Sequence, residues 1–240
     1  MKKYDTLQFQ KDLDALCIHL SDSQIDQFLT YYEMLSEKNK VMNLTAISEY
    51  EDVLKKHFVD SLCLVKACEL FTGMSLIDVG TGAGFPGLAL KIAFPELKVT
   101  LLDSLNKRVL FLDDVIRKLS LKDVHTVHGR AEDLAKPGEL REKYDLCVSR
   151  AVANLSTLSE YCLPFVKVGG MFIAYKSEKV FEELSAANHS ISLLEGELEN
   201  QVEFTLPNSD VYRNLIVIRK KRKTSDRFPR KSGLPSRDPL

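Results

Sequence analysis

Four glycines in one short stretch give the most direct sign of chemistry in this 240-residue chain. An apolar run, residues 76–79, contains Asp78, and Gly80, Gly82, Gly84 and Gly87 follow it. An apolar helical pattern begins directly afterwards. Glycine lets a backbone turn tightly and approach a ligand closely, and a helix N-terminus presents unpaired N–H groups. The stretch therefore predicts a site for a nucleoside-containing cofactor.

One interpretation of this loop is a dinucleotide site. Residues 82–87 read as G-x-G-x-x-G, and Asp103 lies 21 residues after Gly82, near the end of the next predicted strand. This spacing matches the dinucleotide fingerprint, in which the acid accepts hydrogen bonds from two ribose hydroxyls.

The other interpretation is S-adenosylmethionine, which has no pyrophosphate but carries a sulfonium, an amino group and a carboxylate. Asp78, at the strand end, can help to hold the cationic methionine end, while loop N–H groups donate to the carboxylate. An acid at this position would lie near the pyrophosphate of a dinucleotide and weaken its binding. The loop favours S-adenosylmethionine and leaves the dinucleotide as an open alternative.

Strands and helices must alternate to position this loop. Helical spacing of apolar residues predicts helices at 21–42 and 50–69, ahead of the first strand. Strands are predicted at 76–79, 98–102, 124–127, 144–148 and 171–175, with helices between them and another at 178–188. Residues 191–194, 202–206 and 215–218 also look like strands but lack a crossover helix, which indicates an antiparallel hairpin.

This pattern predicts an α/β protein with a doubly wound, Rossmann-like S-adenosylmethionine methyltransferase sheet that ends in an antiparallel hairpin. A helical N-terminal segment (1–70) precedes the methyltransferase domain (71–220), and a basic C-terminal tail (221–240) follows it. The hairpin and the single set of βα units both argue against a dinucleotide enzyme. Ligands in such sheets bind beyond the C-terminal strand ends, where Arg150 follows the fourth strand.

Composition excludes several other classes of protein. No apolar run approaches the roughly 20 residues that cross a bilayer, and the polar N-terminus is not a signal peptide. The five cysteines form no C-x-x-C pair, and the five histidines show no metal spacing. We expect a cytoplasmic protein with no metal site and no membrane association.

Charge is distributed unevenly along a chain whose net charge is only −1. Residues 213–240 contain ten Lys or Arg and two Asp, so this end is strongly basic and the remainder is acidic. Such asymmetry is typical of a tail that contacts an anion, and equally of a disordered, solubilising tail.

Several motifs together resemble one family over almost the whole chain, the bacterial methyltransferase G family acting on small-subunit ribosomal RNA, also called glucose-inhibited division protein B. In order they are Asn43-Leu44-Thr45, His57-Phe58-Val59-Asp60-Ser61-Leu62, the loop 78–87, Leu102-Asp103-Ser104, Gly129-Arg130-Ala131-Glu132, Ser149-Arg150-Ala151-Val152-Ala153 and the tail from Arg227-Phe228-Pro229-Arg230 to Leu240.

The resemblance implies methyl transfer from S-adenosylmethionine to N7 of a guanine in 16S ribosomal RNA. It places Asp103 on the ribose side of the cofactor. The other cofactor contacts that it implies are Gly80, Phe85, Ala131, Glu132 and Arg150. The expected partner is 16S ribosomal RNA or the small ribosomal subunit, bound by a monomer.

The residues are consistent with this reaction. Residues 149–152 lack the Asn/Asp-Pro-Pro-aromatic corner of amine methyltransferases, and Cys147 and Cys162 lie in a strand and a helix rather than in a Pro-Cys loop. Guanine N7 carries an exposed lone pair and no proton, so no general base is needed. Arg150, at the mouth of the site, is the predicted catalytic residue, able to bind the cofactor or donate to guanine O6.

Some assignments stay open. Asn43 and His57 could form a cap over a guanine pocket, but helix termination and an interhelical hydrogen bond are the favoured interpretations. The tail is expected to bind RNA, so its removal should weaken RNA binding and leave cofactor affinity intact. The alternative functions are methylation of another RNA or a small molecule, and a non-catalytic ribosome-assembly factor.

Overall fold

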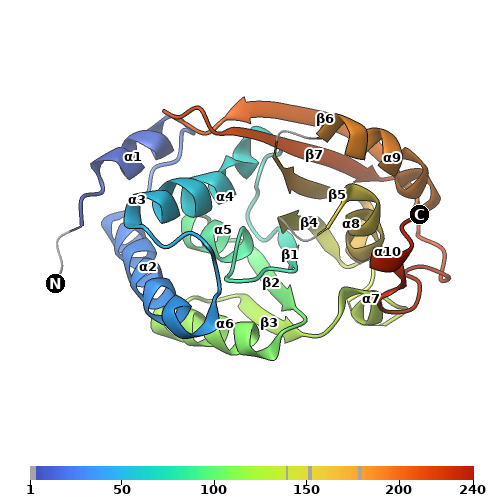
Figure 1. Cartoon of the computed structure of the whole chain (residues 1–240), viewed down its shortest axis with the longest axis horizontal. Coiled ribbons are helices and arrows are strands. Elements are labelled where there is room, and N and C mark those ends of the chain that lie inside the picture. The colour runs from blue at the N-terminus through green and yellow to red at the C-terminus, as the bar shows by residue number, and fades with distance from the viewer. Residues whose placement is uncertain (1–3, 139, 151–152, 178–179) are drawn as a thin grey trace.

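A mixed sheet with helices on both faces forms the centre of the molecule (Figure 1). The structure, a computed structural model, describes residues 4–138, 140–150, 153–177 and 180–240. The strands are β1 (Ser75–Val79), β2 (Lys98–Asp103), β3 (Val124–His128), β4 (Tyr144–Arg150), β5 (Val166–Lys176), β6 (Gly196–Thr205) and β7 (Tyr212–Lys220). Their order is β3-β2-β1-β4-β5-β7-β6.

Strands β1 to β5 pair in parallel, whereas β7 pairs antiparallel with both β5 and β6. Strand order reverses between β1 and β4, which puts the expected ligand site over the C-terminal ends of these two strands. The predicted doubly wound sheet with a terminal antiparallel hairpin is confirmed.

Two sets of helices cover the two faces (Figure 1). On one face lie α1 (Leu7–Asp14), α2 (Asp22–Met42), α5 (Gly87–Ala93), α6 (Asn106–Lys118) and one continuous helical segment made of α3 (Tyr50–Val53), η1 (Leu54–Val59), α4 (Asp60–Leu62) and η2 (Cys63–Lys66). On the other lie α7 (Ala131–Leu134), α8 (Leu155–Cys162), η3 (Leu163–Phe165), α9 (Val180–Leu193) and α10 (Leu234–Arg237).

Alternation along the strands produces these two cores. In β1, Leu76 packs into the core beneath α5, whereas Ile77 and Val79 pack into the core beneath α8. Successive strand side chains point to opposite faces, so Asp78 shares the α5 face with Leu76. Asp78 therefore lies between the sheet and the start of α5, where Gly87 N donates to its carboxylate.

The ends of α2 follow the local chemistry of the sequence. Ser21 and Gln24 form a capping box at its N-terminus, and Asn43 ends the helix in the left-handed region, with φ of 49°. Asn43 therefore terminates this helix, which is the interpretation favoured from the sequence. The Gln24 amide also donates to Ile92 O and Ala93 O of α5, which ties the N-terminal helices to the domain.

One predicted strand is wrong. Residues 191–194 form the last turn of α9 and the residue after it, not a strand. The apolar residues of this region recur at intervals of three and four and all face the core beneath α8, which is helical rather than strand spacing. They are Val180, Leu184, Ala187, Ile191 and Leu194.

The C-terminal segment, residues 221–240, is folded against α7 and α8. The Arg141 guanidinium donates to Thr224 O at 2.7 Å and to Phe228 O at 2.8 Å, and the Phe228 ring is buried in the core beneath α8. Arg230 forms a forked ion pair with Glu160, a carboxylate that is 1% exposed. From its composition this segment looks like a polar tail. These contacts nevertheless fix its position on the domain.

No helix among the described residues is long and apolar enough to cross a membrane.

We expect Phe228→Ala to lower the free energy of unfolding by about 3 kcal/mol, because it empties a buried aromatic site. Urea denaturation measures this change, and Lys223→Ala, at an exposed position of the same segment, is the control. Equal stability of both variants and the wild type would mean that the segment is not part of the folded core.

Candidate active site

The glycine loop between β1 and α5 closes on the end of β2. Gly80, Gly82 and Gly84 have φ angles of 72°, 62° and 104°, a region that favours glycine. The N–H groups of Gly80 and Thr81 donate to Leu102 O at 2.9 and 3.0 Å. These loop donors are used within the protein, so the loop is held in shape by the neighbouring strand.

Asp78 lies beneath this loop and has no exposed surface. Its Oδ2 accepts hydrogen bonds from the Thr81 hydroxyl at 2.7 Å and from Gly87 N at 2.8 Å. Burial raises the pKa of Asp78 to about 6, although both of these hydrogen bonds oppose the shift. A Cβ at Gly87 would come within 2.6 Å of Leu101 Cδ2, which explains the glycine. Asp78 therefore organises the loop from below.

Asp103, the last residue of β2, faces the loop from the side. Its Oδ2 accepts from Gly82 N and its Oδ1 from Leu105 N, both at 2.9 Å. Arg108 Nη1 lies 3.3 Å from Oδ2. Oδ2 thus has two donors, whereas Oδ1 has one and keeps a second lone pair, so Asp103 can still accept from a ligand.

A pocket of about 360 Å³ opens between the loop and Asp103, and we call it the loop pocket. Five of the residues predicted to bind the cofactor line it together, namely Gly80, Gly82, Phe85, Asp103 and Arg150. Thr45 and His57 of the N-terminal segment complete its wall. The cofactor domain and the N-terminal helices thus share one pocket.

Gly84 lies on the other side of the loop, against α2. A Cβ there would collide with the Tyr31 hydroxyl and lie 2.9 Å from Leu112 Cδ2. The Tyr31 hydroxyl donates to Ala83 O, and the Tyr31 ring stacks on Phe85 with centroids 5.4 Å apart. Gly84 is needed for this close approach of α2 to the loop.

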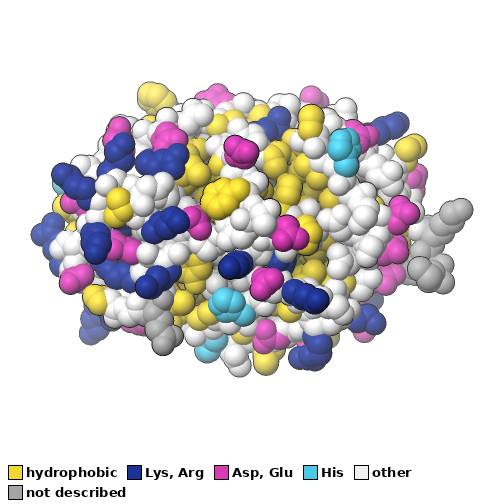
Figure 2. All heavy atoms as spheres, turned by 180° about the vertical axis from the view of Figure 1, so that it is seen from behind, with side chains coloured by type: hydrophobic (Ala, Val, Ile, Leu, Met, Phe, Trp, Pro, Cys, Tyr) yellow, Lys and Arg dark blue, Asp and Glu magenta, His cyan; other side chains and the backbone are white. Residues whose placement is uncertain are grey.

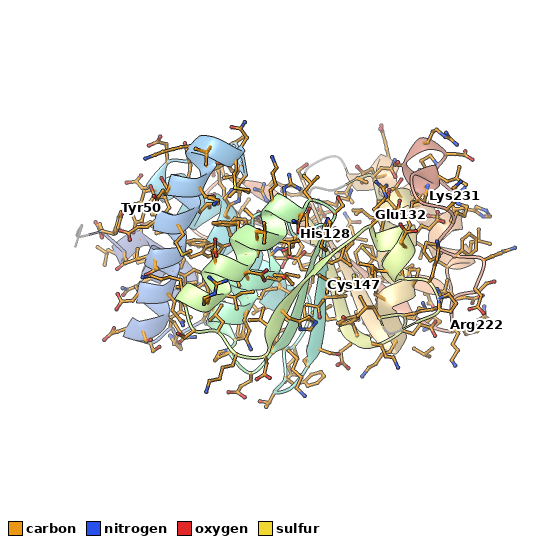
Figure 3. The ribbon with its side chains drawn as sticks, turned by 90° about the horizontal axis from the view of Figure 1, so that it is seen from below. Tyr50, His128, Glu132, Cys147, Arg222 and Lys231 are labelled. Carbon is orange, nitrogen blue, oxygen red and sulfur yellow. The ribbon has the colours of Figure 1, made fainter. Side chains whose placement is uncertain are left out.

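Ala131 and Glu132 begin α7 and are both buried, outside the wall of the loop pocket. Glu132 Oε1 accepts from Arg130 Nη2 and from Gly233 N, each at 2.8 Å. Figure 3 shows Glu132 on the side of the molecule where the C-terminal segment with Lys231 lies. The Glu132 carboxylate therefore fastens the C-terminal segment, and the predicted cofactor contacts of both residues stay predictions.

Arg150 ends β4 and is the most connected side chain of the site. Its Nη1 donates to Asp60 Oδ2 at 3.1 Å and to Lys56 O at 3.2 Å, and its Nη2 donates to His57 Nδ1 at 3.0 Å. The guanidinium carbon lies 5.2 Å from the centre of the Phe85 ring. A buried carboxylate, a ring nitrogen and an aromatic face therefore fix this arginine.

His57 connects the two sides of the site. A guanidinium can only donate, so His57 Nδ1 is the acceptor and its proton is on Nε2, which donates to Thr45 Oγ1 at 2.8 Å. Burial, and then the charge of Arg150, lower the pKa of His57 to about 3. The ring stacks on Phe85 with centroids 4.5 Å apart. His57 is thus neutral and part of the pocket wall, not merely a link between helices.

The segment that presents His57 is a single π-helical turn, η1. Such wide turns within α-helices occur frequently at functional sites. The apolar spacing of residues 50–69 predicts an uninterrupted helix, because the same face stays buried on both sides of the wide turn. Periodicity carries no signal that could have revealed it.

A second pocket, of about 410 Å³, lies beyond Arg150 and His57 at the end of β5, and we call it the β5 pocket. Both residues line both pockets. Asp60, 3% exposed, accepts from Arg150 Nη1 at 3.1 Å and from Arg213 Nε at 3.0 Å. No site role was predicted for Asp60 or Arg213, because only the fold brings α4 and β7 to the end of β4. Ala151 and Val152, also part of the predicted corner, lie outside the described residues.

The basic run 219–223 is mostly neutralised. Arg219, Lys221 and Arg222 pair with the Glu199, Glu197 and Glu195 carboxylates respectively, and Lys220 is fully buried. Figure 2 shows Lys and Arg side chains gathered on the left of the rear face, with Asp and Glu among them. Among the described residues, no group of His, Cys, Asp or Glu is placed to hold a metal ion.

Known proteins resemble this chain over most of its length. A family model described as rRNA small subunit methyltransferase G matches residues 24–215. Ribosomal RNA small subunit methyltransferase G of Lachnoclostridium phytofermentans is 51% identical over 236 residues, 98% of each chain, and that of Acetivibrio thermocellus is 53% identical over 93% of this chain and 91% of its own.

Solved structures support the fold alone. A SAM-dependent methyltransferase from Aquifex aeolicus superposes with a TM-score of 0.52 at 19% identity, over 70% of this chain and 92% of its own. Its likeness is to the sheet and its helices. Because the family model and the relatives span most of the sequence, this chain belongs to the rRNA small subunit methyltransferase G family.

Proposed function

We propose that this protein transfers the methyl group of S-adenosylmethionine to N7 of a guanine in 16S ribosomal RNA. The observation that carries the proposal is the pair of pockets that share Arg150 and His57 as a common wall. One pocket suits the methyl donor and the other suits the acceptor base. A reaction between two bound molecules needs such adjacent sites.

The residues of the loop pocket fit S-adenosylmethionine. Asp103 Oδ1 accepts one hydrogen bond and keeps a lone pair for a ribose hydroxyl, and Gly80 and Gly82 present backbone without a side chain. Arg150 has N–H groups beyond those it donates within the protein, which suit the methionine carboxylate. When bound, the cofactor supplies a methyl group on a positively charged sulfur.

The remaining predicted cofactor residues would act in other ways. Asp78 and Gly84 would shape the loop rather than touch the ligand, since Asp78 has no exposed surface and neither residue lines the loop pocket. Ala131 and Glu132 would contribute backbone groups at the start of α7, because the Glu132 side chain is already bonded to Arg130 and Gly233.

The chain supplies alignment rather than proton transfer. Guanine N7 carries no proton, so attack needs no general base. The state of His57 is consistent with this, because its neutral ring accepts a hydrogen bond from Arg150 and donates one to Thr45. Holding N7 and the methyl group in line can lower the barrier by several kcal/mol, as oriented reactants do in general.

The proposed partner is the ribosomal RNA of the small subunit. Four exposed cations of the C-terminal segment form no ion pair among the described residues, namely Lys223, Arg227, Lys231 and Arg237. They remain available for phosphates, whereas Arg219, Lys221 and Arg222 are already paired with carboxylates. Each phosphate contact would add to the salt dependence of binding.

The direct test is methylation of small subunits prepared from cells that lack this protein. With labelled S-adenosylmethionine, we expect label in 16S ribosomal RNA and 7-methylguanosine in its nuclease digest. Label on another base or another position of guanine would contradict N7 transfer. Binding of S-adenosylhomocysteine without any label in ribosomal RNA would point to a different substrate.

We expect Arg150→Lys to reduce kcat/KM for small subunits at least about 100-fold, because misplacement by an ångström can cost this much. Lysine keeps the positive charge beside Asp60 but lacks the planar fork that also reaches His57. Arg117→Ala, at an exposed site of α6, is the control. Near-normal turnover of Arg150→Lys in a folded protein would refute the role of Arg150.

His57 makes stability depend on pH. Its folded pKa of about 3 lies below the unfolded value of 6.5, so its contribution is present above pH 6.5 and is lost as pH falls toward 3. Between pH 7 and pH 5 the loss amounts to about 2 kcal/mol. Urea denaturation of His57→Gln should show a pH dependence smaller by this amount. An unchanged dependence would mean that folding does not lower the pKa of His57.

A further inference from the structure

Two carboxylates line the β5 pocket, and only Asp60 uses both of its oxygens in ion pairs within the protein. Both oxygens of Asp60 accept from guanidinium groups, of Arg150 and of Arg213. Glu183, in the first turn of α9, contacts Lys176 Nζ through Oε2 at 2.7 Å. Within the described part of the chain its other oxygen has no bonded partner, and its side chain is 36% exposed. Glu183 therefore presents a free acceptor to the pocket.

The sheet orders the pocket from one end to the other. Arg150 ends β4 and lies opposite Tyr175 of the neighbouring β5, with Lys176 next to it. Adjacent strands lie about 4.8 Å apart. The end of the β5 pocket at Arg150 and His57 faces the loop pocket, and the end at Lys176 and Glu183 lies one strand further from it.

The two edges of a guanine base differ in the same direction along the pocket. Its N7 and O6 acceptors lie on one edge. Its Watson–Crick edge carries N1–H and the N2 amino group, two donors that a single carboxylate can accept. Adenine has a lone pair at N1 and no N2 amino group, so a carboxylate there would face an acceptor. A base with N7 toward the methyl donor therefore directs its Watson–Crick edge toward β5.

We propose that Glu183 recognises the Watson–Crick edge of the acceptor guanine and selects guanine over adenine, with Lys176 holding the carboxylate in place. The assignment rests on the proposed function, because it takes the β5 pocket as the acceptor site. It also requires an unpaired target guanine, since a base pair would occupy the same edge.

The first experiment compares Glu183→Gln with Glu182→Gln, the same change at an exposed neighbour outside the pocket. We expect Glu183→Gln to lower kcat/KM for small subunits about 10- to 100-fold, the usual range for a paired base contact. Its affinity for S-adenosylhomocysteine should stay within about twofold of the wild type, as in Glu182→Gln. Wild-type kcat/KM in Glu183→Gln, or an equal loss in Glu182→Gln, would overturn the assignment.

The second experiment separates recognition from a merely structural role. Small subunits are reconstituted with 16S ribosomal RNA that carries one inosine, which lacks the N2 amino group, at the methylated position. Wild-type enzyme should lose about tenfold in kcat/KM on inosine, whereas Glu183→Gln should lose less, because its side chain has already lost one of the two acceptor oxygens. Equal losses in both enzymes would show that Glu183 does not read this edge. A wild type inactive on unmodified subunits would instead refute the proposed function itself.

Discussion

The Arg150 guanidinium, held between Asp60 and His57, is the interaction on which the rest of the site depends. Burying a charge is costly unless a partner and hydrogen bonds compensate it, and here a nearly inaccessible carboxylate and a ring nitrogen do so. These partners come from the N-terminal helices, whereas Arg150 ends a strand of the sheet. The ion pair therefore joins two parts of the chain and forms the wall between two pockets.

Aromatic stacking supports this wall from the side of the loop. Phe85 contacts His57 on one side and Tyr31 on the other, with centroid distances of 4.5 and 5.4 Å. Tyr31 reaches the loop because Gly84 has no side chain. The N-terminal helices are thus part of the machinery, since they supply one wall of the loop pocket and the partners of its arginine.

The sequence predicted what local chemistry determines. Strand and helix periodicity, the glycine loop and the acid that ends β2 follow from rules that act over a few residues, and the family resemblance supplied the substrate. Asp78 is the next-to-last residue of β1 and Asp103 the last residue of β2. One lies beneath the loop and the other beside it, which no spacing rule distinguishes. No site role could be predicted for Asp60 or Glu183, because only tertiary packing brings α4 and α9 to the end of β5. The strand predicted at residues 191–194 is an error of another kind. The apolar run is too short for its spacing to distinguish a helix from a strand.

The most direct test of the two-pocket account is an experimental structure with S-adenosylhomocysteine bound. We expect the ribose at Asp103, the amino acid part in the loop pocket with its carboxylate at Arg150, and the sulfur facing the boundary at Arg150 and His57. The β5 pocket should stay free for a base. Density for the ligand in the β5 pocket, or a sulfur that faces away from Arg150, would contradict the assignment of donor and acceptor sites.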